Sequence, residues 1–191
     1  DAARQMWKPI AEALNLDPES VEWVNVQPTA KVSALQSGAI DATTHFYSVH
    51  FIYEDIFGDD LGYALLRDEG LNPYGLAYFA NNAAMEEKAE TIESMVHVTQ
   101  RAFAFCIATP EPCAEALSNA VSMKPEDALR ELEYASKLMP GKDNALPVGA
   151  WDTDRIARDY ELVSASFDIN PFDPTTVITN RFIDQSIQYP E

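Results

Sequence analysis

The chain has 191 residues, of which 47% are hydrophobic and 10% aromatic, and this is enough apolar material to form a core. Thirty-one acidic residues against thirteen basic ones give a formal net charge of −18. This charge excludes nucleic acids as partners, because phosphates would be repelled, and it disfavours an anionic membrane surface. No apolar run approaches the roughly 20 residues that a membrane span requires, so we expect no direct membrane insertion.

The first part of the chain alternates helical and strand patterns. Met6, Ile10 and Leu14 are spaced by four, which predicts an amphipathic helix, and residues 21–26 alternate and are rich in β-branched side chains. The predicted elements are a helix at 2–14, a strand at 21–26, a helix at 28–36, a strand at 39–44, a helix at 49–57, and strands at 63–67 and 74–79. This order indicates a parallel α/β sheet.

After Asn81 the character of the sequence changes, and helical spacing with proline, serine or threonine starts dominates. We predict helices at 85–108, 112–121, 125–139, 153–167 and 174–183, with a loop at 142–150. The chain therefore divides at about residues 72–82, with an α/β part before and a mostly helical part after.

The only two cysteines, Cys106 and Cys113, flank what reads as a corner between two helices. Their spacing is poor for zinc. A disulfide across the corner is geometrically possible and would suit an oxidising compartment, whereas two buried free thiols are the alternative.

Several short motifs occur in a characteristic order. They are the strand Val24-Asn25-Val26 followed by Pro28, the helix end and strand Ala34-Leu35-Gln36-Ser37-Gly38-Ala39-Ile40-Asp41-Ala42, the stretch 74–81, and Thr179-Asn180-Arg181-Phe182-Ile183. In this order and spacing the chain resembles the NMT1/THI5-like family of solute-binding proteins.

The resemblance implies a fold like that of the periplasmic binding proteins, with two lobes that close over a ligand at a hinge. It implies a partial α/β lobe at 1–66, hinge strands at 67–82, and a helical C-terminal part at 83–191 that completes the other lobe. The resemblance also implies that part of the family's first lobe precedes Asp1, and that an export signal lies upstream. We therefore expect a periplasmic or extracytoplasmic location.

The resemblance implies the substrate-binding component of an ABC importer, with the permease subunits as partners and no cofactor. Family members serve importers of nitrate, sulfonates, taurine and thiamine pyrimidine precursors, and one branch makes the pyrimidine enzymatically. That branch needs a cysteine-rich motif and a lysine for pyridoxal phosphate, which we do not find in matching contexts. We therefore expect a small polar or heteroaromatic ligand and no catalysis. The alternatives are a THI5-like enzyme and an interaction module without a role in transport.

Ligands of open α/β sheets collect beyond the carboxyl ends of the strands, and this rule selects the candidate residues. The predicted ligand-binding residues are Asp1, Gln27, Thr44, His45, Phe46, Tyr47 and Tyr74. Phe46 and Tyr47 are suited to stacking on a planar ligand, and Tyr74 precedes a glycine at the expected hinge. Asp1 would occupy the amides at a helix start, which disfavours an anion and favours a ligand with N–H donors, such as an aminopyrimidine.

Each of these residues also has a purely structural interpretation. The stretch from His45 to Tyr47 could end a strand and pack on the next helix, and Tyr74 could be an ordinary strand start. His45 and His50 are five apart with no carboxylate in phase, so we expect no metal. The three tryptophans, Trp7, Trp23 and Trp151, are more typical of a core than of a ligand platform.

Overall fold

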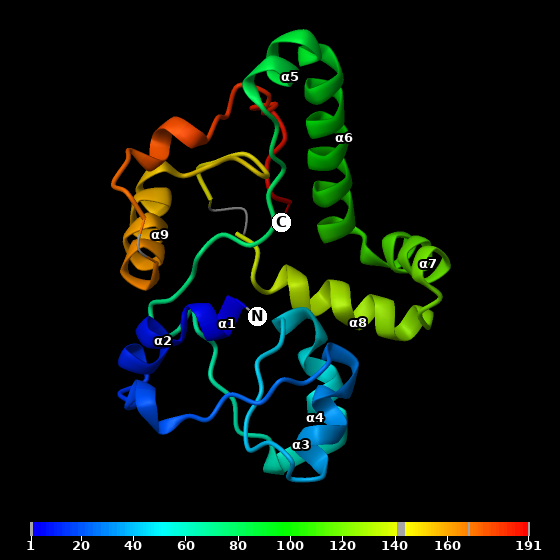
Figure 1. The fold of residues 1–191 in the computed structure, drawn as a ribbon. Helices are drawn as coiled ribbons and strands as arrows, with labels where there is room; N and C mark the ends of the chain where they lie inside the picture. Colours follow the sequence, from blue (N-terminus) through cyan, green and yellow to red (C-terminus); the bar gives the residue numbers. More distant parts are fainter. Residues whose placement is uncertain (1, 141–143, 168, 191) are drawn as a thin grey trace. The chain divides into compact units, whose positions relative to one another are not determined.

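The computed structural model describes residues 2–140, 144–167 and 169–190 (Figure 1). The chain forms two compact units. The first unit consists of Asp1–Pro73 and Ala157–Phe172, and the second of Tyr74–Ile156 and Asp173–Glu191. The first division of the chain, between Pro73 and Tyr74, lies inside the segment 67–82 that the sequence marks as a hinge.

The predicted α/β fold class is wrong, because all regular elements in the described residues are helices. The segments 21–26, 39–44, 63–67 and 74–79, which we expected to be strands, form no ladder. Val21 does have an extended backbone, with φ −113° and ψ 124°. Alternating β-branched residues favour this extended conformation locally, but a strand also needs a partner strand to pair its backbone groups.

The predicted helix at 2–14 is two helices, α1 (Ala2–Gln5) and α2 (Trp7–Ala13). Pro9 explains the interruption. In a continuous helix its ring would meet the carbonyl of Gln5, and that carbonyl would lose its hydrogen bond. With α2 beginning at Trp7, Pro9 falls in the first turn, where no backbone amide is needed.

Helix α3 (Lys31–Gln36) is terminated by a glycine that lies two residues beyond its end. Gly38 has a φ of +68°. Its amide donates to the carbonyl of Leu35 at 3.1 Å, and the amide of Ala39 donates to the carbonyl of Ala34 at 2.9 Å. This pair of bonds is a Schellman motif, which satisfies the last carbonyls of the helix and turns the chain out of it.

Helix α4 (His50–Phe57) provides the buried centre of the first unit. His50, Phe51 and Tyr53 are all buried on it. Ile10 and Ala11 of α2 are also buried. On each helix the buried residues lie within one turn, and His50 is the polar residue among them.

The helices of the second unit begin with α5 (Asn82–Glu87) and α6 (Ala89–Ala108). The single helix that we predicted over 85–108 is therefore interrupted, and the backbone leaves helical geometry at Lys88, with φ −124° and ψ 27°. Asn81 caps α5 by accepting a 2.8 Å hydrogen bond from the amide of Ala84. An asparagine in this position satisfies one of the free amides at a helix start.

Helices α7 (Pro110–Val121) and α8 (Pro125–Ser136) follow, and each begins with a proline in its first turn. Figure 1 shows α7 following the lower end of α6, and a short turn leading from the other end of α7 into α8. Ala114 of α7 and Ala128 of α8 are buried. Such small side chains allow helix backbones to approach closely.

Helix α9 (Thr153–Ser166) begins in the second unit and continues in the first. The last predicted helix, at 174–183, is wrong in length, because only a 3₁₀ turn, Pro174–Val177, forms there. The predicted loop at 142–150 is described from residue 144 onward, and it contains no helix there. No helix in the described parts of the chain is long and apolar enough to cross a membrane.

Gln100 of α6 is the polar centre of the second unit, with only 3% of its surface exposed. Its side-chain amide donates to the carbonyls of Val148 at 2.9 Å and Asp184 at 3.2 Å. Its side-chain oxygen accepts from the amide of Asp184 at 2.9 Å. One side chain thus joins three segments of the second unit that are distant in sequence.

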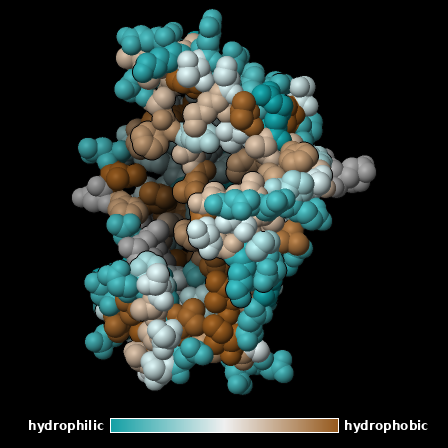
Figure 2. All heavy atoms as spheres, turned by 90° about the vertical axis from the view of Figure 1, so that its right-hand side faces the viewer, coloured by the Kyte–Doolittle hydropathy of each residue, from teal (hydrophilic) through white to brown (hydrophobic). Residues whose placement is uncertain are grey.

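The segment 74–81, which leads into α5, is apolar yet exposed. Leu76 and Phe79 have essentially all of their surface accessible. The hydroxyls of Tyr78 and of Thr99 on α6 are 3.3 Å apart, which attaches the segment to that helix. Figure 2 shows hydrophobic residues reaching the surface at several places on the viewed face.

Candidate functional site

Four of the predicted ligand-binding residues lie together in the segment from Thr44 to Tyr47 in the first unit. Lys31, at the start of α3, donates a hydrogen bond from its Nζ to the carbonyl oxygen of Thr44 at 2.8 Å. Gln27 precedes the 3₁₀ turn Pro28–Ala30, which leads directly to Lys31, and its carbonyl accepts a 2.9 Å bond from the amide of Ala30. The Lys31 bond therefore fixes the candidate segment against the start of α3.

His45 lies in an aromatic cluster built on α4. Its ring stacks on that of Tyr53, with 4.0 Å between ring centroids and 11° between the planes. Its Nε2 is 3.0 Å from Nδ1 of His50, a hydrogen bond in which one ring donates and the other accepts. His50 is 1% exposed, and its Nε2 lies 3.6 Å from Oε1 of Glu54. This arrangement holds the imidazole of His45 in one orientation.

The environment keeps the imidazole of His45 neutral. Partial burial, assisted by the nearby charges of His50 and Lys31, lowers the pKa of His45 from its usual 6.5 to about 4. Burial also raises the pKa of the Tyr53 hydroxyl above its usual 10.0. The side chains of His45 and Tyr53 are therefore both uncharged near neutral pH. They are neutral donors and acceptors of hydrogen bonds.

Phe46 and Tyr47 differ in what their rings contact. The ring of Tyr47 stacks near that of His50, with 5.3 Å between centroids, and Tyr63 lies on the same imidazole at 4.3 Å. Phe46, in contrast, leaves 84% of its surface exposed. Of the two predicted stacking residues, only Phe46 thus presents an exposed ring, and in sequence it follows the exposed Thr44 and the half-buried His45.

Tyr74 belongs to the second unit, where it packs against the start of α9. Its hydroxyl accepts a 3.0 Å hydrogen bond from the amide of Asp152. The ring of Trp151 meets it edge to face at 4.7 Å, and the guanidinium of Arg155 lies 4.0 Å from the ring centroid. These contacts hold the Tyr74 side chain in place, but the strand start that the alternative interpretation expected there does not form.

The remaining predicted residue, Asp1, lies outside the described residues. The sequence interpretation missed Lys31, His50 and Tyr53 as neighbours of the candidate segment. The spacing of three between His50 and Tyr53 places both on one face of a helix, and this was a usable signal. Nothing local in the sequence relates Lys31 to Thr44.

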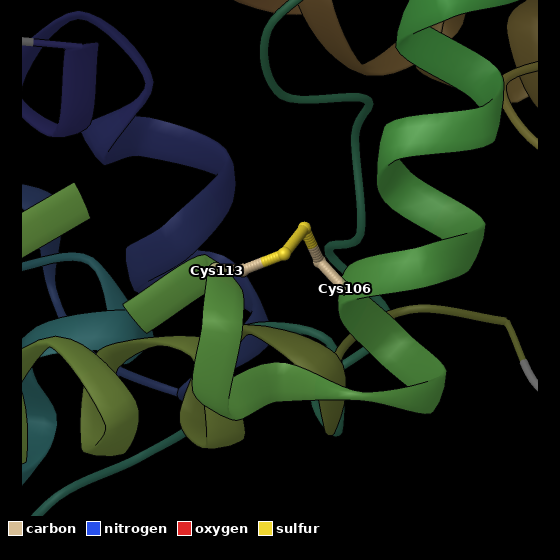
Figure 3. The surroundings of a disulfide bond; sticks show 2 residues. All are labelled: Cys106 and Cys113. Carbon is tan, nitrogen blue, oxygen red and sulfur yellow. A yellow bond between two sulfur atoms is a disulfide. The ribbon is translucent and has the colours of Figure 1, made fainter. Parts of the chain in front are cut away.

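The structure contains a disulfide between Cys106 and Cys113, with 5.6 Å between the two Cα atoms. Figure 3 shows it between the end of α6 and the start of α7. Neither cysteine is therefore available as a nucleophile or a metal ligand. Across the described residues, no group of three or more His, Cys, Asp or Glu side chains is arranged to hold a metal ion.

An exposed aromatic ring can stack on a small planar molecule, and a neutral imidazole can exchange hydrogen bonds with one. In a comparison with known protein families, residues 1–113 match the family described as NMT1/THI5 like. The chain belongs to the NMT1/THI5-like family. This membership is consistent with a solute-binding role. No curated protein and no solved structure matches the chain.

Proposed function

We propose that the chain is the substrate-binding component of an ABC importer, and that it binds a small polar or heteroaromatic solute without chemical conversion. The observation that carries this proposal is membership of the NMT1/THI5-like family. The ligand belongs to the class of thiamine pyrimidine precursors, sulfonates or nitrate-like ions. Its transport partners are the permease subunits.

We propose that the segment from Thr44 to Phe46 contacts the ligand. Gln27 is included because it lies close in sequence to Lys31, which holds the carbonyl of Thr44. Phe46 supplies the exposed ring for stacking, and His45 supplies a neutral imidazole whose orientation the His50 bond fixes. A neutral imidazole donates or accepts a hydrogen bond at no cost in charge burial. Within the proposed class, these groups favour a planar heterocycle with N–H donors over nitrate.

An extracytoplasmic location is part of the proposal. Members of this family are typically exported, and the Cys106–Cys113 disulfide is of the kind that persists in oxidising compartments.

The test is a thermal-shift measurement with nitrate, taurine, an aminopyrimidine and a simple amine. A ligand present at 100 times its Kd stabilises the folded state by about 2.7 kcal/mol, which corresponds to a rise in Tm of about 5–10 °C for a chain of this size. We expect such a rise with the aminopyrimidine. No shift with any member of the panel would refute the binding role.

Two variants locate the site. Phe46→Ala removes the exposed ring and should abolish most of the shift, whereas Phe105→Ala removes a half-exposed ring on α6 and should leave it unchanged. Absorbance of bound pyridoxal phosphate in the purified protein would contradict the absence of catalysis and indicate a THI5-like enzyme instead.

A further inference from the structure

The first unit has an open hollow of about 520 Å³ that none of the proposed ligand-binding residues lines. Its walls come from α1, α2 and the connection that follows them, and they include Arg4, Trp7, Lys8, Glu19, Val21 and Trp23. Ligand pockets typically have volumes of about 300–1,000 Å³, so the hollow is large enough for a small organic molecule.

Two tryptophans provide the apolar part of this hollow. Trp7 and Trp23 meet edge to face, with 5.7 Å between ring centroids and 81° between the planes. An edge-to-face contact covers one face of one ring, and the pair itself leaves the other ring faces uncovered. The indole N–H of Trp7 donates to the carbonyl of Pro18 at 2.8 Å, which fixes this ring in place.

The wall opposite the helices is also held by local bonds. Asp17 accepts a 3.0 Å hydrogen bond from the amide of Glu19, and its own carbonyl accepts a 2.6 Å bond from the hydroxyl of Ser20. These bonds cap the 3₁₀ turn Pro18–Ser20. Because the turn and the Trp7 ring are fixed, a ligand in the hollow would order few additional groups, which lowers the entropic cost of binding.

The charges that line the hollow differ from those of the whole chain. Arg4 and Lys8 are exposed, and neither forms an ion pair with a carboxylate among the described residues. Against these two cations stands one carboxylate, that of Glu19, so the lining carries a net positive charge in a chain of net charge −18. An anion that most of this acidic protein repels meets two cationic side chains here, and neither is paired with a carboxylate in the part of the chain that the structure describes.

From the tryptophan pair and the two cations we infer that this hollow binds a planar organic anion, an aromatic carboxylate or sulfonate. The ring stacks against Trp7 and Trp23, and the acid group pairs with Arg4 and Lys8. Glu19 opposes the acid group and sets an upper limit on affinity. This site is separate from the segment containing Thr44 and Phe46, and the inference does not depend on the proposed transport function.

The probe for a test is benzenesulfonate, which carries both the ring and the charge. Benzenesulfonamide keeps the ring without the charge, and inorganic sulfate keeps the charge without the ring. Binding is measured by isothermal titration calorimetry and by quenching of the Trp7 and Trp23 emission in a Trp151→Phe background. We expect benzenesulfonate to bind more tightly than either of the other two, and its affinity to fall as salt rises.

Three variants test the assignment of the charges. Arg4→Gln with Lys8→Gln should weaken benzenesulfonate binding by about tenfold or more, because charge-assisted hydrogen bonds are lost. Glu19→Gln should instead tighten binding, and merely disturbing the fold would not produce this gain. Lys124→Gln, which removes an exposed lysine at the start of α8, is the matched control and should have no effect.

The outcomes separate this inference from the proposed function. If Phe46→Ala abolishes benzenesulfonate binding while Arg4→Gln with Lys8→Gln leaves it intact, the anion binds at the other site, and the inference is overturned. Equal affinity for benzenesulfonate and benzenesulfonamide would also overturn it. If the aminopyrimidine gives no thermal shift but the hollow binds benzenesulfonate as expected, the proposed function fails and this inference stands.

Discussion

His45 makes the stability of the first unit depend on pH. Its pKa in the folded protein is about 4, below the usual 6.5, so the folded state takes up this proton at a lower pH than the unfolded state does. The resulting stabilisation is complete above pH 6.5 and is lost as the pH falls toward 4. We predict that the urea midpoint decreases over this window, and that His45→Gln makes the decrease smaller.

Two aspartates, Asp173 and Asp184, affect stability over a different pH range. Hydrogen bonds from Thr175 and Ser186 lower the pKa values of Asp173 and Asp184 below 3.8, so their effect is lost only at lower pH. An identical pH profile for His45→Gln and the unchanged protein would contradict the role assigned to His45.

In the second unit, we expect Gln100 to contribute more to the free energy of unfolding than any other single residue. Gln100→Leu would leave the carbonyls of Val148 and Asp184 and the amide of Asp184 without their side-chain partner. We predict a loss of about 3 kcal/mol in the free energy of unfolding, because buried polar groups without partners are costly. Urea denaturation measures this loss. Gln188→Leu, at an exposed position, should change the free energy by less than about 0.5 kcal/mol.

Among the elements, the end of α3 is sensitive to a single glycine. A Cβ at Gly38 would meet no atom within 4 Å, so the effect of Gly38→Ala comes from the backbone alone, whose φ is +68°. We predict a loss of about 1 kcal/mol in stability, measured by thermal unfolding. Gly62→Ala is the control, because Gly62 also has open space but no positive φ, and it should be neutral or slightly stabilising. Equal effects of the two substitutions would refute this explanation.

The disulfide stabilises the connection between α6 and α7. Replacing both Cys106 and Cys113 with serine should lower the free energy of unfolding by about 2–3 kcal/mol, the value expected for a loop of this length. A thiol reductant should lower the stability of the unchanged protein by a similar amount and should not affect the double variant. If the reductant destabilises both proteins equally, its effect does not come from this bond.

At this scale the helices were predictable and the strands were not. Proline and glycine act locally, so the beginning of α8 at Pro125 and the cap at Gly38 follow from the sequence alone. The interruption at Pro9 was available from the same rules and was overlooked. Strand pairing depends on a partner that may be far away in sequence, and the alternation at 21–26 does not reveal whether one is present.

For the molecule as a whole, the family was predictable because its motifs recur in order, and the match to residues 1–113 confirms the resemblance. The candidate site was predicted only as a segment. That His45 stacks on Tyr53 and that Lys31 holds Thr44 depend on how α3 and α4 pack, and no local pattern specifies this. The hollow lined by Trp7 and Trp23 likewise depends on a contact between two side chains that a turn brings together, and no local pattern predicts this contact.

The exposed segment 74–81 determines which proteases can divide the chain. Between Arg67 and Lys88 there is no lysine or arginine, so trypsin has no cleavage site there, whereas Leu76, Tyr78 and Phe79 are accessible to chymotrypsin. Brief chymotrypsin digestion, analysed by mass spectrometry, should yield fragments that begin or end at residues 76–80. The same exposure to trypsin should leave residues 68–87 in one piece, so the two enzymes should produce different fragments from this part of the chain.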